Sequence, residues 1–273
     1  MNIVVCIKQV PDTTNVKINP ETNTLVRAGV ESIINPFDMY ALEEGLRVRE
    51  QHGGTVTVLS MGPPQVEEAL REAISLGVDE AVLLSDRGFA GADTLATAYT
   101  LAAGIRKLGG AEIIFMGRQA IDGDTGQVGP GVAENLMIPH ITDIRKIESI
   151  AEDGTIIVER MLEEGYVRLK TSLPVLLTVV KEINEPRLPS LKGKLAAKKK
   201  EITTYVEEDL DLDSERIGLT GSPTWVQKIF TPPKPAGGKL FQGEAKEAVA
   251  ALLAELKSAG LPLGAKEADN GID

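Results

Sequence analysis

The sequence predicts an α/β fold built on a doubly wound, mostly parallel sheet. Short β-rich apolar runs alternate with longer segments of helical periodicity through the first half of the chain, which is typical of successive parallel βαβ units. The chain has 273 residues, of which 42% are hydrophobic and 25% charged, so it can form one large domain with a substantial appendage. Because βαβ crossovers are right-handed, helices are expected on both faces of the sheet.

Four parallel strands are the minimum that this pattern predicts. The apolar runs lie at residues 3–7, 56–61, 81–85 and 113–116. The intervening helices are predicted at residues 40–51, 64–76, 94–108 and 127–136, where apolar side chains recur at intervals of three and four residues. Each of these helices can therefore lay one face on the sheet.

The second half of the chain has a different pattern. Residues 156–161 and 165–169 predict a β-hairpin, and residues 175–180 predict a buried strand that rejoins the main sheet. Residues 184–200 predict a polar loop, and the irregular, proline-containing stretch 217–243 predicts an arm that lies on another surface. An amphipathic helix is predicted at 244–259. We therefore divide the chain into an α/β domain at 1–205 and a C-terminal arm and helix at 206–273.

Composition excludes several classes of function. The 40 acidic and 29 basic residues give a net charge of −11, which disfavours binding to nucleic acid or to a membrane surface. One cysteine and two histidines offer no disulfide and no zinc spacing, and they favour a reducing cytoplasm. The N-terminal apolar run is too short to span a membrane and lacks the basic segment of a signal peptide. No nucleophile lies in a pattern with a general base, so no catalytic residue is predicted.

The candidate binding site lies in four loops at the carboxyl ends of the predicted strands, where doubly wound sheets bind ligands. These loops are residues 35–38, 61–63, 85–94 and 117–130. The last is the most informative, because its small residues allow close approach and the amides of Thr125 and Gln127 would open a helix suited to a phosphate. Asp122 and Asp124 suit a ribose hydroxyl. The alternative is that Asp124 or Thr125 merely caps the helix. Neither the GxGxxG nor the GxxxxGK[ST] fingerprint is present.

Several motifs together resemble the β subunit of electron transfer flavoprotein, over essentially the whole chain. They are Lys8-Gln9-Val10, Asn35-Pro36-Phe37-Asp38 with Ala41-Leu42-Glu43, Met61-Gly62-Pro63, Gly117-Arg118-Gln119-Ala120-Ile121-Asp122 with Gln127 and Gly129, and Asn184-Glu185-Pro186-Arg187 leading to Lys198-Lys199-Lys200. The resemblance implies an adenine-nucleotide hydrolase-like α/β domain that pairs with an α subunit carrying a flavin. On this basis residues 1–205 would bind a nucleotide or flavin, and residues 206–273 would contact the α subunit.

Two branches of the family differ in the ligand of the β subunit. The housekeeping branch holds AMP, and the electron-bifurcating branch holds a second FAD. This chain resembles the second branch in its segment 85–94 with Thr97, in Gly123-Asp124-Thr125, and in the arm at 230–233. Gly88, Gly91 and Gly123 would leave room for a ligand longer than AMP.

The resemblance and the four loops together predict the cofactor site. FAD would lie on the amides of residues 125–129, with Asp122 and Asp93 on hydroxyls and Thr94 and Thr97 near the diphosphate. The residues assigned to the site are Cys6, Lys8, Asn35, Phe37, Asp38, Met61, Gly62, Asp93, Thr94, Thr97, Gly117, Arg118, Gln119, Asp122, Gly123, Asp124, Thr125, Gln127, Val128 and Gly129.

The resemblance also implies an electron path and its partners. The β-subunit FAD would accept hydride from NADH, send one electron to ferredoxin or flavodoxin, and send the other through the α-subunit FAD to an acyl-CoA dehydrogenase or a related flavoprotein. Residues 184–200 match the family's recognition loop, with Leu191 at the docking leucine and with Arg187 and Lys192 beside it. Residues 188–195 differ from the housekeeping loop, so the partner need not be a standard acyl-CoA dehydrogenase.

Two other interpretations remain at this point. A housekeeping β subunit would hold AMP, and the number of flavins per heterodimer distinguishes it from the bifurcating type. A stand-alone ATP-binding protein of the same fold is disfavoured, because no Ser-Gly-Gly-x-Asp-Ser pyrophosphate loop follows the first strand.

Overall fold

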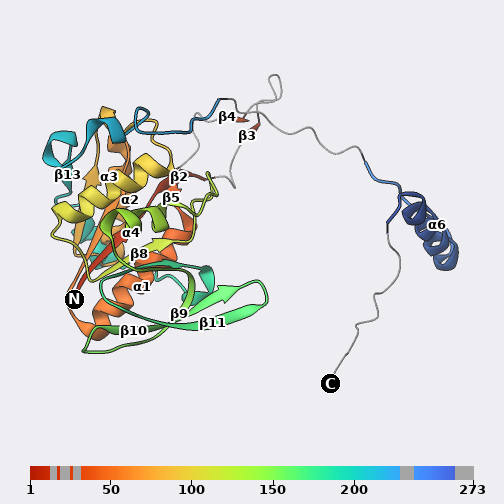
Figure 1. Ribbon diagram of the computed structural model, residues 1–273, viewed down its shortest axis with the longest axis horizontal. Coiled ribbons are helices and arrows are strands. Elements are labelled where there is room, and N and C mark those ends of the chain that lie inside the picture. Colours follow the sequence, from red (N-terminus) through yellow and green to blue (C-terminus); the bar gives the residue numbers. More distant parts are fainter. Residues whose placement is uncertain (13–16, 19–24, 27–31, 228–236, 262–273) are drawn as a thin grey trace. The chain divides into compact units, whose positions relative to one another are not determined.

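The computed structural model describes residues 1–12, 17–18, 25–26, 32–227 and 237–261. Its centre is a nine-stranded sheet in the order β11-β10-β9-β12-β8-β1-β6-β7-β13 (Figure 1). The parallel strands are β1 (Asn2–Cys6), β6 (Thr55–Met61), β7 (Glu80–Leu84), β8 (Ile113–Gly117), β12 (Val175–Val179) and β13 (Thr203–Tyr205). Strand β9 (His140–Ile150) is parallel to β12, and β10 (Thr155–Leu162) and β11 (Gly165–Ser172) continue the sheet in antiparallel fashion.

Helices cover both faces of this sheet. Strand β1 shows why: Ile3 and Val5 face one hydrophobic cluster, and Val4 and Cys6 face the other, because successive side chains of a strand point to opposite sides. Helices α1 (Pro36–His52) and α2 (Glu67–Leu76) pack in the first cluster. Helices α3 (Thr94–Lys107) and α4 (Val128–Leu136) pack in the second. The prediction of a doubly wound, mostly parallel sheet is confirmed.

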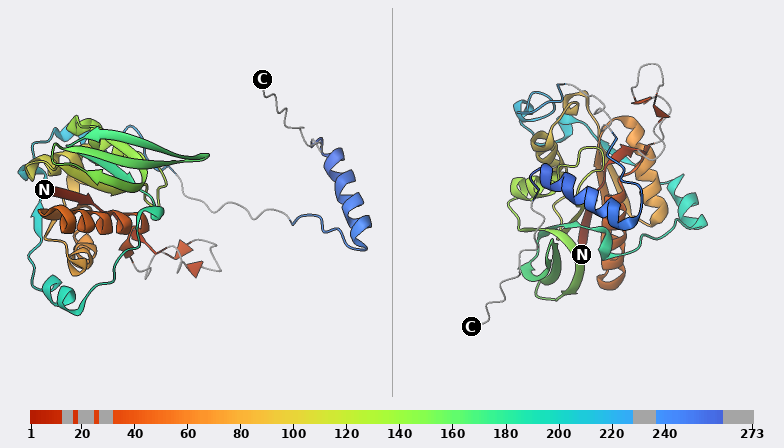
Figure 2. Two further views of the ribbon diagram at one scale, coloured as in Figure 1. Left: turned by 90° about the horizontal axis from the view of Figure 1, so that it is seen from below. Right: turned by 90° about the vertical axis from the view of Figure 1, so that its right-hand side faces the viewer.

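The predicted hairpin is present as β10 and β11, and Figure 2 shows it, drawn in green, extending beyond the other strands of the sheet. The buried strand that rejoins the sheet is β12. The sequence analysis did not predict β9, which lies between them and joins the hairpin to the parallel sheet. Two short pairs were also missed, β2 (Gln9–Pro11) with β5 (Ser32–Ile34) and β3 (Lys17–Ile18) with β4 (Leu25–Val26).

The prediction that residues 184–200 form only a polar loop is wrong, because the segment contains helix α5 (Leu191–Ala197). The Ser190 hydroxyl caps this helix by accepting a hydrogen bond from the Gly193 amide at 2.9 Å. Gly193 also lets the helix approach α2 closely, since a Cβ there would lie 2.1 Å from the Ser75 carbonyl oxygen. Ala197 is buried in the cluster of α1 and α2.

The first compact unit extends from Met1 to Ile229, beyond the predicted boundary at residue 205. Leu210 and Ile217 are buried in the cluster of α3 and α4, so this part of the predicted arm packs on the α/β domain. The second unit, Phe230–Asp273, contains helix α6 (Ala245–Ser258), which agrees with the predicted helix at 244–259. Part of the arm, residues 228–236, lies outside the described residues. None of the helices described here is long and apolar enough to cross a membrane.

Candidate functional site

The order of the strands locates the candidate site. From β1 the chain passes to β6 and β7 on one side and then returns to β8 on the other side of β1. The chain therefore changes direction between β1 and β8, and in open α/β sheets the ligand crevice lies outside the carboxyl ends of the strands at such a point. Lys8 follows β1 there, and the loop 118–127 follows β8.

The first turn of α1 ties these two strand ends together. Asp38 accepts hydrogen bonds from the Lys8 amide at 2.7 Å and from the Gly117 amide at 3.0 Å. Asn35 donates to the Gln119 carbonyl at 2.8 Å and accepts from the Ile121 amide at 3.1 Å. Both side chains are buried, and Pro36 begins the helix between them. Asn35 and Asp38 thus act as a clamp on the ends of β1 and β8, and both side chains are buried rather than exposed.

The environment of Asp38 changes its acidity. Burial raises the pKa of Asp38 to about 7, against the opposing effect of the amide donors and the Lys8 charge. The close approach of the first turn of α1 to the end of β8 requires a glycine at 117. A Cβ there would lie 2.4 Å from Asp38 Oδ1 and 2.7 Å from the Phe37 Cβ. Phe37 is itself half-buried beside this contact.

Charged side chains of the loop after β8 are paired. Lys8 Nζ contacts both carboxylate oxygens of Asp122 at 2.8 Å, which bridges the loops after β1 and β8. Arg118 Nε lies 3.1 Å from Asp143 Oδ1. The side-chain Nε2 of Gln119 donates a hydrogen bond to Asp124 Oδ1. The structure therefore brings the predicted residues 8, 118, 119, 122 and 124 together, and it adds Asp143 from β9, which the sequence analysis missed.

The start of α4 has no side-chain cap. Gln127 is its N-cap residue and makes no capping hydrogen bond, so the alternative in which Asp124 or Thr125 caps the helix is wrong. The first turn contains no acidic residue either. The Thr94 hydroxyl donates to Gln127 Oε1 at 2.9 Å, which brings the starts of α3 and α4 together. Uncapped amides at the start of a helix suit an anion such as a phosphate.

The carboxylate of Asp93 has no acceptor capacity left. Its Oδ1 accepts from the amides of Leu95 and Ala96 at 2.9 and 3.2 Å and so caps α3. Its Oδ2 accepts from the amide and the hydroxyl of Thr224 at 3.1 and 2.8 Å. Partial burial raises the pKa of Asp93, but these hydrogen bonds outweigh it and lower the pKa below its ordinary value. A ligand hydroxyl would have to replace Thr224, a contact that the sequence analysis did not foresee.

The remaining predicted residues divide into a buried framework and an exposed loop. Cys6 is buried in the cluster of α3 and α4, and burial raises the pKa of its thiol well above the ordinary value. Met61 and Val128 pack against the same cluster, and Gly129 is buried. The half-buried residues are Gly62 and Thr97, and the exposed ones are Gly123 and Thr125. In the residues that the structure describes, no group of His, Cys, Asp or Glu could hold a metal ion.

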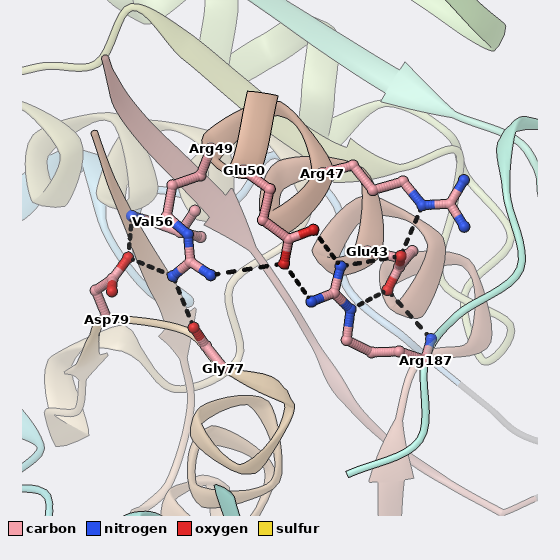
Figure 3. A network of polar contacts seen from close by, with 8 residues as sticks. All are labelled: Glu43, Arg47, Arg49, Glu50, Val56, Gly77, Asp79 and Arg187. Atoms are coloured by element: carbon pink, nitrogen blue, oxygen red, sulfur yellow. Dashed lines mark hydrogen bonds and ion pairs between the residues drawn. The ribbon is translucent and has the colours of Figure 1, made fainter. Parts of the chain in front are cut away.

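The predicted docking residues lie apart from this crevice. Leu191 is 77% exposed, and Lys192 is exposed beside it. Arg187 instead turns inward and binds two glutamates of α1: its Nε lies 2.7 Å from Glu43 Oε2, and its Nη1 lies 2.5 Å from Glu50 Oε1 (Figure 3). Arg187 therefore anchors the segment, and Lys192 is the exposed cation next to Leu191.

Comparison with known proteins shows the family of this chain. The electron transfer flavoprotein domain matches residues 22–210. The electron transfer flavoprotein subunit beta of Thermoanaerobacterium thermosaccharolyticum is 55% identical over 94% of this chain and 98% of that protein. The caffeyl-CoA reductase-Etf complex subunit CarD of Acetobacterium woodii is 49% identical over 94% and 98%. Protein FixA of Azorhizobium caulinodans is 49% identical over 85% of each chain. On this family match and these identities, the chain belongs to the electron transfer flavoprotein β-subunit family.

Proposed function

We propose that this chain is the β subunit of an electron-bifurcating electron transfer flavoprotein, which binds FAD in the crevice between the ends of β1 and β8. Membership of the family already implies electron transfer, association with a flavin or nucleotide, and a heterodimer with an α subunit. The bifurcating activity, FAD as the ligand and NADH as the donor are the proposal.

The observation that carries the proposal is the uncapped start of α4 opposite the start of α3. The Gln127 side chain is held by Thr94 and does not cap the helix, so the amides of Val128 and Gly129 have no side-chain acceptor there. A diphosphate is the part of FAD that such donors suit. A Cβ on Gly123 would meet nothing within 4 Å, so this glycine leaves room as predicted. The same prediction is wrong for Gly88 and Gly91, because a Cβ there would lie 2.6 Å from Glu207 Oε2 and 3.3 Å from the Leu219 Cβ.

Each nearby side chain would have a definite role toward the ligand. Lys8 places a positive charge beside the loop after β8 while it is paired with Asp122. The Asp122 side chain is 32% exposed and retains carboxylate lone pairs for a ribose hydroxyl. Thr94 and Thr97, on the first turn of α3, would offer hydroxyls near the diphosphate. Asp93 would accept a hydroxyl only after releasing Thr224.

The chemistry that FAD supplies when bound is the acceptance of a hydride from NADH and the delivery of its two electrons one at a time. This chain's own part is to bind and orient the ligand. Asn35 and Asp38 fix the two strand ends that frame it. A carrier of this kind needs no nucleophile or general base from the protein, and none is proposed.

The proposed partners follow the family's electron path. Ferredoxin or flavodoxin would take one electron, and an acyl-CoA dehydrogenase or related flavoprotein would take the other through the FAD of the α subunit. The name of the CarD relative, which places it in a caffeyl-CoA reductase-Etf complex, supports a CoA-ester reductase as the acceptor. Residues 206–273 would contact the α subunit, and the complex would act in the cytoplasm.

The experiment that tests the proposal is release of the bound nucleotides from the purified heterodimer. Denaturation followed by chromatography should give two FAD and no AMP per heterodimer. One FAD with one AMP would overturn the bifurcating assignment and favour the housekeeping interpretation. Recovery of ATP, in a chain that purifies without an α subunit, would instead favour a stand-alone nucleotide-binding protein.

A further inference from the structure

An apolar ridge rises from the segment 184–200, which we call the docking segment. Leu188, Leu191 and Leu195 are 90%, 77% and 55% exposed. Leu191 and Leu195 are four residues apart on α5 and so share one side of the helix. The exposed lysines around them are Lys192, Lys194, Lys198 and Lys199. An apolar ridge within a basic rim suits a protein partner that has an apolar pocket with an acidic border.

Helix α1 anchors the beginning of this segment. Asn184 donates to the Tyr40 carbonyl at 3.0 Å and to Glu44 at 2.9 Å. Arg187 reaches Glu43 with its backbone amide at 3.1 Å as well as with its guanidinium group, as Figure 3 shows. Glu43 is only 4% exposed, so this contact is largely shielded from solvent.

The ionisation of Glu43 supports this anchor. Burial raises its pKa, but hydrogen bonds from Arg187 and Arg47 outweigh burial and lower the pKa below the ordinary value. Glu43 is therefore a carboxylate at neutral pH. A neutral amide at 43 would leave the Arg187 charge with Glu50 alone, at the exposed side of the helix.

Helix α2 anchors the end of the segment. Arg71 donates to the Ala197 carbonyl at 2.7 Å and to the Lys200 carbonyl at 3.3 Å, which are the last groups of α5 and of the turn after it. Glu67, one turn earlier on α2, holds Arg71 in this position. Lys200 in turn binds Glu80 at 2.9 Å.

We infer that Glu43 and Arg71 are positioning residues that hold the docking segment in its binding conformation before the partner arrives. The inference rests on the proposed function, in which this segment docks an acyl-CoA dehydrogenase or related flavoprotein. An anchored segment loses less conformational entropy on binding than a free loop does, so the anchors increase affinity without touching the partner. They should therefore affect partner affinity and leave the cofactor site unchanged, because Arg71 lies on α2 and Glu43 lies beyond the first turn of α1, which holds the ends of β1 and β8.

The test uses the complete heterodimer with Arg71→Gln and Glu43→Gln. The matched control is Arg106→Gln, because Arg106 also donates from a helix to a carbonyl, that of Asn135, at 3.1 Å but on the other face of the sheet. Two quantities are measured: hydrogen exchange of the amides of residues 191–200, and KM and kcat for an acyl-CoA dehydrogenase that the wild-type heterodimer reduces.

Both anchor variants should exchange faster in α5 and raise KM by about tenfold, the factor that corresponds to about 1.4 kcal/mol, with kcat and bound flavin unchanged. The control should match the wild type. Restoration of the wild-type KM by Arg71→Lys, which keeps a charged donor on a longer side chain than that of glutamine, would support positioning further. An unchanged KM in both anchor variants would overturn the inference.

Failure of the proposed function would look different. Leu191→Ala should raise KM whether or not the anchors matter, because it removes a contact with the partner itself. If Leu191→Ala raises KM and the anchor variants do not, the docking function stands and positioning is overturned. If Leu191→Ala has no effect either, the docking function fails and the inference falls with it.

Discussion

Asp38 Oδ1 accepts a hydrogen bond from the Gly117 amide at 3.0 Å, although 79 positions separate the two residues in the sequence. The other oxygen of the same carboxylate accepts from the Lys8 amide at 2.7 Å. One side chain from the first turn of α1 thus fixes the distance between the ends of β1 and β8, which are the two walls of the proposed cofactor crevice. A change at Asp38 or Gly117 is therefore expected to alter both the free energy of unfolding and the binding of a ligand at these strand ends.

Gly117→Ala should destabilise the protein by about 2 kcal/mol, a typical cost of overpacking a filled site. A Cβ at 117 would lie 2.4 Å from Asp38 Oδ1 and 2.6 Å from the Phe37 carbonyl carbon, so the clamp would have to open. Thermal unfolding of the heterodimer measures the effect. Gly123→Ala is the control, since a Cβ there meets nothing. Equal melting temperatures for the two variants would show that the clamp is not rigid.

Asp38 should also make stability depend on pH. Burial raises its pKa in the folded protein to about 7 from an ordinary value of 3.8. The native state therefore binds the proton more tightly than the unfolded state does. The stabilising contribution of the protonated Asp38 is complete below pH 3.8 and is lost as the pH rises through 7. The difference in unfolding free energy between the wild type and Asp38→Asn should shrink over this window by a few kcal/mol, roughly 1.4 per pH unit.

Denaturant unfolding at a series of pH values measures this difference. Asparagine has no charge to lose, so Asp38→Asn provides the pH-independent reference at this site. A difference that grows with pH would contradict the prediction. It would mean that the two amide donors keep Asp38 ionised throughout.

Gly123→Val should lower the flavin content of the heterodimer, and after flavin has been removed from both proteins its melting temperature should equal that of the wild type. A Cβ at 123 has nothing within 4 Å, so the side chain can be added without a close contact at its Cβ. It would instead occupy the space at the uncapped start of α4 where the ligand is proposed to lie. Absorbance of purified protein gives flavin per heterodimer. An unchanged flavin content would mean that this loop is not at the ligand.

Sequence reasoning succeeded where apolar periodicity is strong. Strand β1 is predicted by the apolar run that contains Ile3, Val4 and Val5, which are all fully buried. Runs of this kind are typical of the buried strands of a parallel sheet. Strand β9 carries no such run: most of its side chains are only half-buried, and Asp143 adopts a left-handed φ of 58° that breaks the alternation. Nothing local in residues 140–150 distinguishes this strand from a loop.

The site was predictable in outline but not in its contacts. The loops at the ends of β6, β7 and β8 follow from the doubly wound topology, and the loop after β8 lies within the predicted segment 117–130. Residues 35–38 were predicted as a loop, but Asn35 is the N-cap of α1 and Asp38 lies in its first turn. The partner of Asp93 does not follow, because Thr224 lies 131 positions away. The pairing of Arg187 with Glu43 spans 144 positions. Contacts between residues so far apart in the sequence produce no periodic pattern. For this reason Asp93, predicted as a ligand, is a helix cap, and Arg187, predicted for docking, is an anchor.

Leu253→Asp should weaken the heterodimer. Helix α6 exposes Val249, Leu252 and Leu253, at intervals of three and four residues, which makes an apolar stripe. The proposed occupant is the α subunit, and burying a charge in that interface would cost on the order of 3 kcal/mol, or about a hundredfold in Kd. Analytical ultracentrifugation across a dilution series measures this. Ala251→Asp on the opposite side of α6 is the control, and equal effects of the two variants would mean that the stripe is not the contact.

Leu191→Ala should slow electron delivery to the dehydrogenase while NADH reduces the bound flavin at the normal rate. Leu191 is 77% exposed and lies on α5, whereas the proposed flavin crevice is framed by Lys8 and Gly117 at the ends of β1 and β8. The two events therefore use different surfaces. Truncation of a hot-spot leucine typically costs on the order of 2 kcal/mol, which is about thirtyfold in affinity.

The basic rim around Leu191 predicts a further effect, on the rate of association with the partner. The exposed Lys192 and Lys194 stand beside the leucine on a chain of net charge −11, so they should steer an acidic partner face. Lys192→Gln should lower the association rate most at low salt, whereas Leu191→Ala should mainly raise the dissociation rate. Stopped-flow mixing at two ionic strengths separates these effects. A Leu191→Ala heterodimer that reduces its dehydrogenase normally would show the docking segment to be only a connector, and one that also loses reduction by NADH would show that the segment supports the flavin site instead.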